Sequence, residues 1–340
     1  MKDQSRRDFL RSLMLGATTL AAQPLLASCG VKPTSTAQTP AETLAASEVA
    51  PTEAASSDSS TEAVTETQNQ YPYLVVTRGS DAEQMVRQGM NALGGMERFM
   101  KQGADVIIKP NICIGYYTYE YAATTNPWVV AALVKMCLEA GAKRVRVMDY
   151  PFGGTGEQCY KNSGIADLVT TAGGEMEVMS ELKYVETDIP DAVRLKKASI
   201  YQDILTTDLL INVPIAKTHS MALLTLGLKN LMGTMLNRES IHPSFEQNLV
   251  DLATVVRPQL TIIDAIRTLM ANGPTGGNLD DVKLQNTLIF SHDVVAADSY
   301  ATRLFDKKPE YLRYVMKAAE RGLGKADLTG LNIQEINLDA

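Results

Sequence analysis

The strongest constraint on the fold is a repeated pattern in which a short, continuous apolar run is followed by a helical segment. Apolar runs without polar alternation are typical of strands that are buried on both faces of a parallel sheet. The helical segments between them supply the crossovers that parallel strands need. We therefore predict an α/β fold with a mostly parallel sheet and helices on both faces. The expected strands are YLVVT, DVIIKPN, KRVRVMDY, EMEVM, DLLINVP, QLTIIDAI and LQNTLIFS.

Polar and ionisable side chains follow five of these expected strands. Right-handed crossovers bring the carboxyl ends of parallel strands to one edge of a sheet, where ligands bind in such folds. The sequence therefore predicts a polar cleft at that edge. The side chains are Lys109 and Asn111, Asp149, Lys217 and His219, Asp264, and finally His292 and Asp293.

Two glycine-rich loops, Gly153–Gly156 and Gly273–Gly277, also follow expected strands. Their backbone N–H groups are able to cradle an anion, which makes Gly153, Gly154 and Gly276 candidate binding positions. Neither loop has a Walker or dinucleotide-binding pattern. Turns that need a positive φ explain the glycines equally well.

Lys229 lies within MALLTLGLKNLMG, a segment that we expect to be helical and that has almost no polar face. An ammonium there must reach the surface, pair with an acid or bind an anionic ligand, because an unpaired buried charge costs several kcal/mol. A desolvated lysine also loses basicity and becomes a nucleophile or a general base. Lys229 is therefore the leading catalytic candidate, together with Lys217.

Two of the chain's three histidines, His219 and His242, flank Lys229. Such a pair can ligate a metal ion, relay a proton or form hydrogen bonds within a core. We keep both as candidate catalytic and metal-binding residues, with Asp264 and Asp149 as assisting carboxylates. His292 precedes Asp293, which is a suitable helix N-cap, and is predicted to be structural.

The amino terminus is predicted to be a targeting segment. SRRDFLRS resembles the twin-arginine export motif, a short apolar stretch follows, and LASCG resembles the lipobox of bacterial lipoproteins. This order predicts a signal peptide over residues 1–28, export by the twin-arginine machinery and lipid attachment at Cys29. The protein would then be anchored in the cell envelope, on the outer side of the cytoplasmic membrane or in the periplasm. A soluble exported protein cut elsewhere, or a retained amino-terminal anchor, would produce a similar sequence.

Residues 29–70 consist mainly of Ala, Ser, Thr, Pro and Glu. Such a segment cannot bury enough apolar area to offset its ordering entropy, so we expect a disordered tether. A glycosylated stalk has the same composition. The α/β domain is then expected to span residues 71–340.

Charge and cysteine content exclude two classes of partner. The formal charge of −7 and the lack of a basic cluster argue against a nucleic-acid surface. The chain has no CxxC spacing, so we expect no iron–sulfur cluster. Cys137 lies in a helical pattern and is expected to be a core thiol, whereas Cys113 and Cys159 are free thiols or a disulfide.

Several blocks resemble the prokaryotic family known as domain of unknown function 362. They are KPN, DLLINVPIAKTH, LGLKNLMG, IHPSF, IIDAI, GPTGG and VVAADSYATRLF, in the family's order from about residue 105 to 324. The resemblance implies an α/β fold but no settled activity. The order His219, Lys229, His242 is distantly similar to the nickel-pincer lactate racemases, in which a lysine carries the cofactor and histidine ligates nickel. LGLKN replaces the Gly-Gly-x-Lys context of that family.

Three classes of function follow. The first is an envelope enzyme that acts on a small anionic molecule at a Lys/His-lined cleft, with a metal ion or covalent cofactor as an option. The second is a tethered solute- or cofactor-binding lipoprotein without chemistry of its own. The third is a structural envelope protein, for which Lys229→Met would be harmless.

Overall fold

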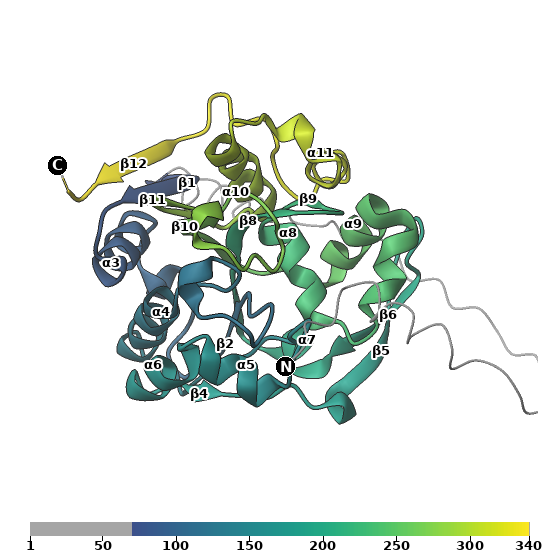
Figure 1. Ribbon diagram of the computed structural model, residues 1–340, viewed down its shortest axis with the longest axis horizontal. Coiled ribbons are helices and arrows are strands. Elements are labelled where there is room, and N and C mark those ends of the chain that lie inside the picture. The colour runs from purple at the N-terminus through teal and green to yellow at the C-terminus, as the bar shows by residue number, and fades with distance from the viewer. Residues whose placement is uncertain (1–69, 340) are drawn as a thin grey trace, which may run out of the picture. The chain divides into compact units, whose positions relative to one another are not determined.

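A computed structural model of the chain describes residues 70–339 (Figure 1). The predicted signal peptide, the lipid-attachment residue Cys29 and the tether lie outside these residues, apart from Gln70. Among residues 70–339, no helix is long and apolar enough to cross a bilayer.

The central sheet confirms the predicted α/β fold with mostly parallel strands. Its strand order is β12-β1-β11-β10-β7-β2-β3-β4. Neighbours pair in parallel from β10 to β4 and between β1 and β12, whereas β11 is antiparallel to both β1 and β10. The strands are β1 (Leu74–Arg78), β2 (Asp105–Pro110), β3 (Arg144–Val147), β4 (Glu175–Met176), β7 (Leu209–Val213), β10 (Leu260–Leu269), β11 (Val282–Ser291) and β12 (Ile333–Asn337).

Helices cover both faces of this sheet, as the unbroken apolar strands require (Figure 1). Ile108 of β2 belongs to the core under α3, α4 and α6, whereas Ile107 belongs to the core under α9, α10 and α11. Successive residues of one strand therefore face opposite apolar layers. The helices are α3 (Ala82–Ala92), α4 (Pro127–Glu139), α6 (Ile165–Thr171), α9 (Phe245–Val255), α10 (Val294–Ala301) and α11 (Arg313–Glu320).

Helix boundaries follow the signals in the sequence. Asn126 caps α4 and Pro127 occupies its first turn, while Gly141 adopts a φ of 86° just past its end. Asp293 caps α10 by accepting hydrogen bonds from Val295 N and Ala296 N, as predicted.

The direction of β11 corrects one prediction. Because β11 is antiparallel to β10, with Ser291 opposite Thr261, its carboxyl end lies at the other edge of the sheet. His292 and Asp293 are therefore remote from the edge at which β2, β3 and β7 end. Apolar composition does not encode strand direction, so the sequence pattern could not reveal this reversal.

The expected helix around Lys229 is also wrong in extent. The segment instead forms β9 (Leu223–Thr225), the short helix α8 (Gly227–Asn230) and a 3₁₀ turn over Leu231–Thr234. β9 pairs with β8 (Ile215–His219), which continues from β7 after Pro214. The hairpin takes residues 223–225 out of the helix. The remaining elements are α5 (Gly156–Asn162), α7 (Gln202–Thr206) and a two-stranded sheet of β5 (Tyr184–Asp188) and β6 (Lys197–Tyr201).

All three cysteines between residues 70 and 339 are free thiols, so Cys113 and Cys159 form no disulfide in the structure. Cys137 is fully buried in the apolar core, as predicted, and burial raises the pKa of its thiol to about 12.

Candidate functional site

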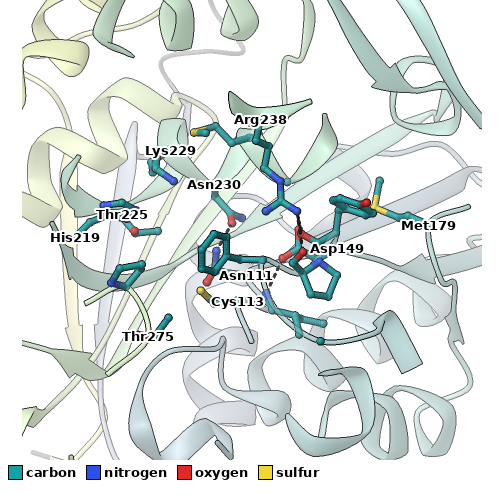
Figure 2. Close-up of a pocket in the computed structure, with 18 of the residues that line it drawn as sticks. Asn111, Cys113, Asp149, Met179, His219, Thr225, Lys229, Asn230, Arg238 and Thr275 are labelled. Atoms are coloured by element: carbon teal, nitrogen blue, oxygen red, sulfur yellow. Dashed lines mark hydrogen bonds between the residues drawn. The ribbon is translucent and has the colours of Figure 1, made fainter. Parts of the chain in front are cut away.

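A cavity of about 860 Å³ lies beyond the carboxyl ends of β2 and β3, beside β8 and α8 (Figure 2). Seven of the predicted site residues line it, whereas Lys109, Gly153, Gly276 and Asp264 do not. The seven are Asn111, Asp149, Gly154, Lys217, His219, Lys229 and His242. The predicted polar cleft therefore exists at the expected edge, with a somewhat different set of residues.

Lys229 extends from α8 toward the space that Arg238 faces from the other side (Figure 2). Its side chain is partly buried, yet its ammonium has no hydrogen bond or ion pair with any residue in the described part of the chain. Burial, reinforced by the charge of Lys217, lowers the pKa of Lys229 to about 8. Lys229 is thus a cation with a partner still to be supplied.

Lys217 is a second cation without a carboxylate partner in the range 70–339. It lies on β8, is almost fully buried, and donates hydrogen bonds to Asn111 Oδ1 at 2.9 Å and to the Ala123 carbonyl at 2.6 Å. Burial lowers the pKa of Lys217, and the neighbouring Cys113 opposes that effect. Both of these acceptors are neutral, so the charge of Lys217 contributes to a positive potential in the cavity.

A chain of three amides forms the floor between Lys217 and α8. Asn111 Nδ2 donates to Asn230 Oδ1 at 2.9 Å, and Asn230 Nδ2 donates to Asn212 Oδ1 at 2.8 Å. Asn212 Nδ2 then donates to the Gly227 carbonyl at 3.0 Å. Because an ammonium only donates, Lys217 fixes the orientation of Asn111 and, through it, of each amide that follows.

Lys109 is already neutralised by Asp149, which was predicted only as an assisting carboxylate at the cleft. Lys109 Nζ lies 2.7 Å from Asp149 Oδ1, and both side chains are buried. Asp149 Oδ2 also accepts a hydrogen bond from Ile112 N at 2.6 Å. Gly233 lies against the pair, because a Cβ at that position would be 2.2 Å from Asp149 Oδ1. Lys109 therefore supports the cavity from behind and has no free charge for a ligand.

His219 is held as a neutral imidazole. Its Nδ1 accepts hydrogen bonds from Met221 N at 3.1 Å and Ala222 N at 3.2 Å. Burial, together with the charges of Lys229 and Lys217, lowers the pKa of His219 to about 3. The single ring proton therefore resides on Nε2, and His219 offers the cavity an N–H donor.

This hydrogen bonding does not fit the predicted metal site. A metal-ligating histidine normally donates through its second ring nitrogen, whereas Nδ1 of His219 accepts two backbone N–H groups. His242 lies in the 3₁₀ segment Arg238–Ser244 with its side chain exposed. Among residues 70–339, no group of three histidine, cysteine or carboxylate side chains is arranged to hold a metal ion.

Two buried aspartates serve the backbone. Asp264 was expected at a strand end but lies within β10, where it accepts hydrogen bonds from Asn126 N and Ile266 N outside the cavity. Asp298 accepts from Gly227 N at 2.6 Å and Leu228 N at 2.9 Å, and so fixes the start of α8. Burial raises the pKa of Asp264 to about 6 and that of Asp298 to about 7. Asp264 does not line the cavity, so the structure gives no support to the acid–base role predicted for it.

The glycine loops behave as turns. Gly153 N donates to the Cys113 carbonyl, and Gly276 N donates to the Asn272 carbonyl, so neither N–H is free for an anion. Gly154 and Gly276 have positive φ angles of 101° and 63°. Of the three glycines, only Gly154 reaches the cavity.

Arg238 is a charged cavity residue that sequence reasoning missed, as it also missed Asn230. Its Nη2 donates to the Tyr150 and Pro151 carbonyls at 2.7 and 2.8 Å, and its guanidinium stacks on the Tyr150 ring. The residue follows no strand and belongs to no recognisable motif. The sequence therefore contained no signal for its position, although it supplies the third cation of the cavity.

Comparison with known proteins confirms the family resemblance. A model of the family described as "Domain of unknown function (DUF362)" matches residues 106–303. "Thylakoid-associated protein sll1697" from Synechocystis sp. is 30% identical over 246 residues, which cover 69% of this chain and 73% of that protein.

Two solved structures show distant similarity. The lactate racemase apoprotein from Thermoanaerobacterium thermosaccharolyticum has a TM-score of 0.46 and 10% identity, over 70% of this chain and 56% of that one. A protein from Thermotoga maritima has a TM-score of 0.38 and 11% identity, over 66% of this chain and 59% of that one. The chain thus spans little more than half the length of each, and neither similarity bears on activity.

Proposed function

The chain belongs to the DUF362 family, and we propose that it is an enzyme that binds a small carboxylate or similar anion and uses Lys229 as its base or nucleophile. One observation carries the proposal. The ammonium of Lys229 faces a cavity without a partner in the described residues, although its environment penalises its charge. Such a residue is costly to keep unless a ligand or a reaction uses it.

The charge balance of the cavity favours an anion. Its lining includes the cations Lys217, Lys229 and Arg238, against the carboxylates of Asp149 and Glu239. Asp149 is already paired with Lys109, which does not itself line the cavity. The remaining net charge of the cavity lining is positive, although the chain as a whole has a formal charge of −7. The cavity therefore attracts anions through its local charge rather than through the charge of the whole chain.

The same arrangement supplies the groups that a reaction needs. A pKa of about 8 leaves roughly a tenth of Lys229 as free amine at neutral pH, far more than an ordinary lysine would provide. Arg238 is held by two carbonyls, so it orients an anionic group without reorganisation. The Nε2–H of His219 can donate to an oxygen that becomes negative during proton abstraction or imine formation.

The first experiment measures anion binding and amine reactivity together. Calorimetry with acetate and pyruvate should show binding at pH 7 that weakens at least tenfold at pH 9.5, because Lys229 loses its charge as the pH rises through about 8. Cyanoborohydride should trap pyruvate on Lys229, with half-maximal rate near pH 8. Lys143, an exposed lysine away from the cavity, is the matched control, and Lys143→Met should leave the trapped adduct unchanged.

The results separate the enzyme from a binding protein. Trapped adduct at Lys229 that disappears in Lys229→Met supports the catalytic proposal. Tight binding of both anions without any adduct, and with both recovered unchanged, would favour the tethered binding lipoprotein. Unaltered anion binding in Lys229→Met would contradict both.

We also propose that the protein works in the cell envelope, exported through its Arg6–Arg7 motif and anchored by acylated Cys29. Intact mass of the protein purified from its own membranes should show cleavage before Cys29 and two or three acyl chains. Cys29→Ala should release the protein from the membrane fraction, whereas Cys137→Ala should not. A full-length, unacylated chain in the cytoplasmic fraction would overturn this location.

A further inference from the structure

The cavity combines a cluster of cations, Lys217, Lys229 and Arg238, with an apolar rim. We propose that its ligand is an anionic amphiphile, whose charged group binds at Lys229 and whose hydrocarbon tail lies against Phe152, Val178 and Met179. This inference rests on the proposed function and names the substrate class of the same site.

Two of the three rim side chains are unusually exposed for their type. Phe152 is 71% exposed and Val178 is 41% exposed, yet both line the cavity together with the buried Met179. Large apolar side chains that gather at a concave site mark a place where apolar surface is covered by a ligand or partner. Met221, which is also exposed, lines the cavity as well, whereas the exposed Leu182 does not.

The rim residues, which we call the apolar wall, come from two segments of the chain. Phe152 lies in the loop between β3 and α5, and Val178 and Met179 follow β4. Gly156, the first residue of α5 after that loop, touches the segment after β4, because a Cβ added at Gly156 would lie 2.9 Å from Val178 Cγ1. A tail placed on this wall would contact both segments at once.

The size of the cavity exceeds what a small acid needs. Its volume of about 860 Å³ is near the upper end of the range, roughly 300–1,000 Å³, that accommodates drug-sized ligands. A two- or three-carbon acid held at Lys229 would leave the apolar wall in water. A hydrocarbon tail fills that space and buries the wall.

The depth of the charges points to a slender ligand rather than a protein surface. Lys217 is almost fully buried and Lys229 partly buried, so a partner must enter the cavity to reach them. A fatty acid or a similar single-chain anion has that shape. The tail would gain contact with the rim while its head group pairs with the ammonium of Lys229.

The test is a chain-length series on the full-length protein. Calorimetry with unbranched carboxylates from acetate to decanoate at pH 7 should show affinity rising by up to about fourfold for each methylene until the wall is covered. The double variant Phe152→Ser, Val178→Ser should flatten this rise, with acetate as the reference that has no tail. Leu182→Ser, at an exposed position that does not line the cavity, should keep the full rise.

The head group is tested separately. Lys229→Met should lower the binding affinity for every carboxylate by a similar factor and leave the dependence of affinity on chain length unchanged. Decyltrimethylammonium, which has a tail one carbon longer and the opposite charge, should bind at least a hundredfold more weakly than decanoate.

Each failure has its own meaning. Equal affinity for acetate and decanoate would overturn the amphiphile while leaving a small-anion enzyme in place. The proposed function would be overturned if Lys229→Met bound decanoate as tightly as the wild type does. Equal affinity for decanoate and decyltrimethylammonium would overturn it as well, because Lys229 would then not bind the charged group.

Discussion

Replacing Lys109 with methionine should lower the free energy of unfolding by about 3–5 kcal/mol. The substitution removes the cation that lies 2.7 Å from Asp149 Oδ1 and leaves that carboxylate buried without its counter-charge. Gly233 closes over the pair, so water has little room to replace the lost ammonium. Urea unfolding at pH 7, monitored by circular dichroism, measures the effect.

Two controls define the cause. Lys143→Met removes an exposed lysine and should change stability by no more than about 0.5 kcal/mol. Lys109→Met combined with Asp149→Asn should recover part of the loss, because no charge is then left unpaired. A cost below about 1 kcal/mol for the single variant would show that the pair is not held as described.

Lys229→Met should have the opposite effect and raise the free energy of unfolding at pH 7. The pKa of Lys229 falls from an ordinary 10.5 to about 8 on folding, and each pKa unit corresponds to about 1.4 kcal/mol. Keeping this lysine charged therefore costs the folded state up to ~3 kcal/mol. Since the side chain is only partly buried, we expect a gain of about 1–3 kcal/mol in the variant.

The pH dependence gives this prediction a signature. The unfolded chain retains the lysine proton up to pH 10.5, whereas the folded chain releases it near pH 8, so the cost shrinks between these values. The advantage of Lys229→Met should be full below pH 8 and absent above about pH 10.5. Unfolding in urea between pH 6 and 11 tests this, and a variant less stable than the wild type at pH 7 would contradict it.

The fold was largely predictable, because unbroken apolar strands and helix caps are local signals. Asn126, Pro127 and Gly141 mark the boundaries of α4 in the sequence as they do in the structure. Strand direction is not local, and β11 therefore misled the assignment of His292 to the cleft. The hairpin of β8 and β9 is likewise set by pairing with distant residues, which the expectation of a long helix could not include.

The site was predictable in its main cations and less so in its supporting groups. Lys217, Lys229 and His219 follow or interrupt apolar segments. The sequence therefore indicated that these ionisable side chains are buried at a cost in free energy. The partners that decide each role were not visible. Asp149 neutralises Lys109, and backbone N–H groups donate hydrogen bonds to the carboxylate of Asp264. Both contacts depend on the tertiary fold.

The one-directional amide floor also has a consequence for how the cavity responds to its occupant. No single asparagine among Asn111, Asn230 and Asn212 can rotate its amide without placing two donors or two acceptors face to face. The floor therefore behaves as a fixed template, and adjustment to different molecules falls to Lys229 and the rim. Selectivity for the charged end would then be strict, while tolerance for the rest of the molecule would be broad.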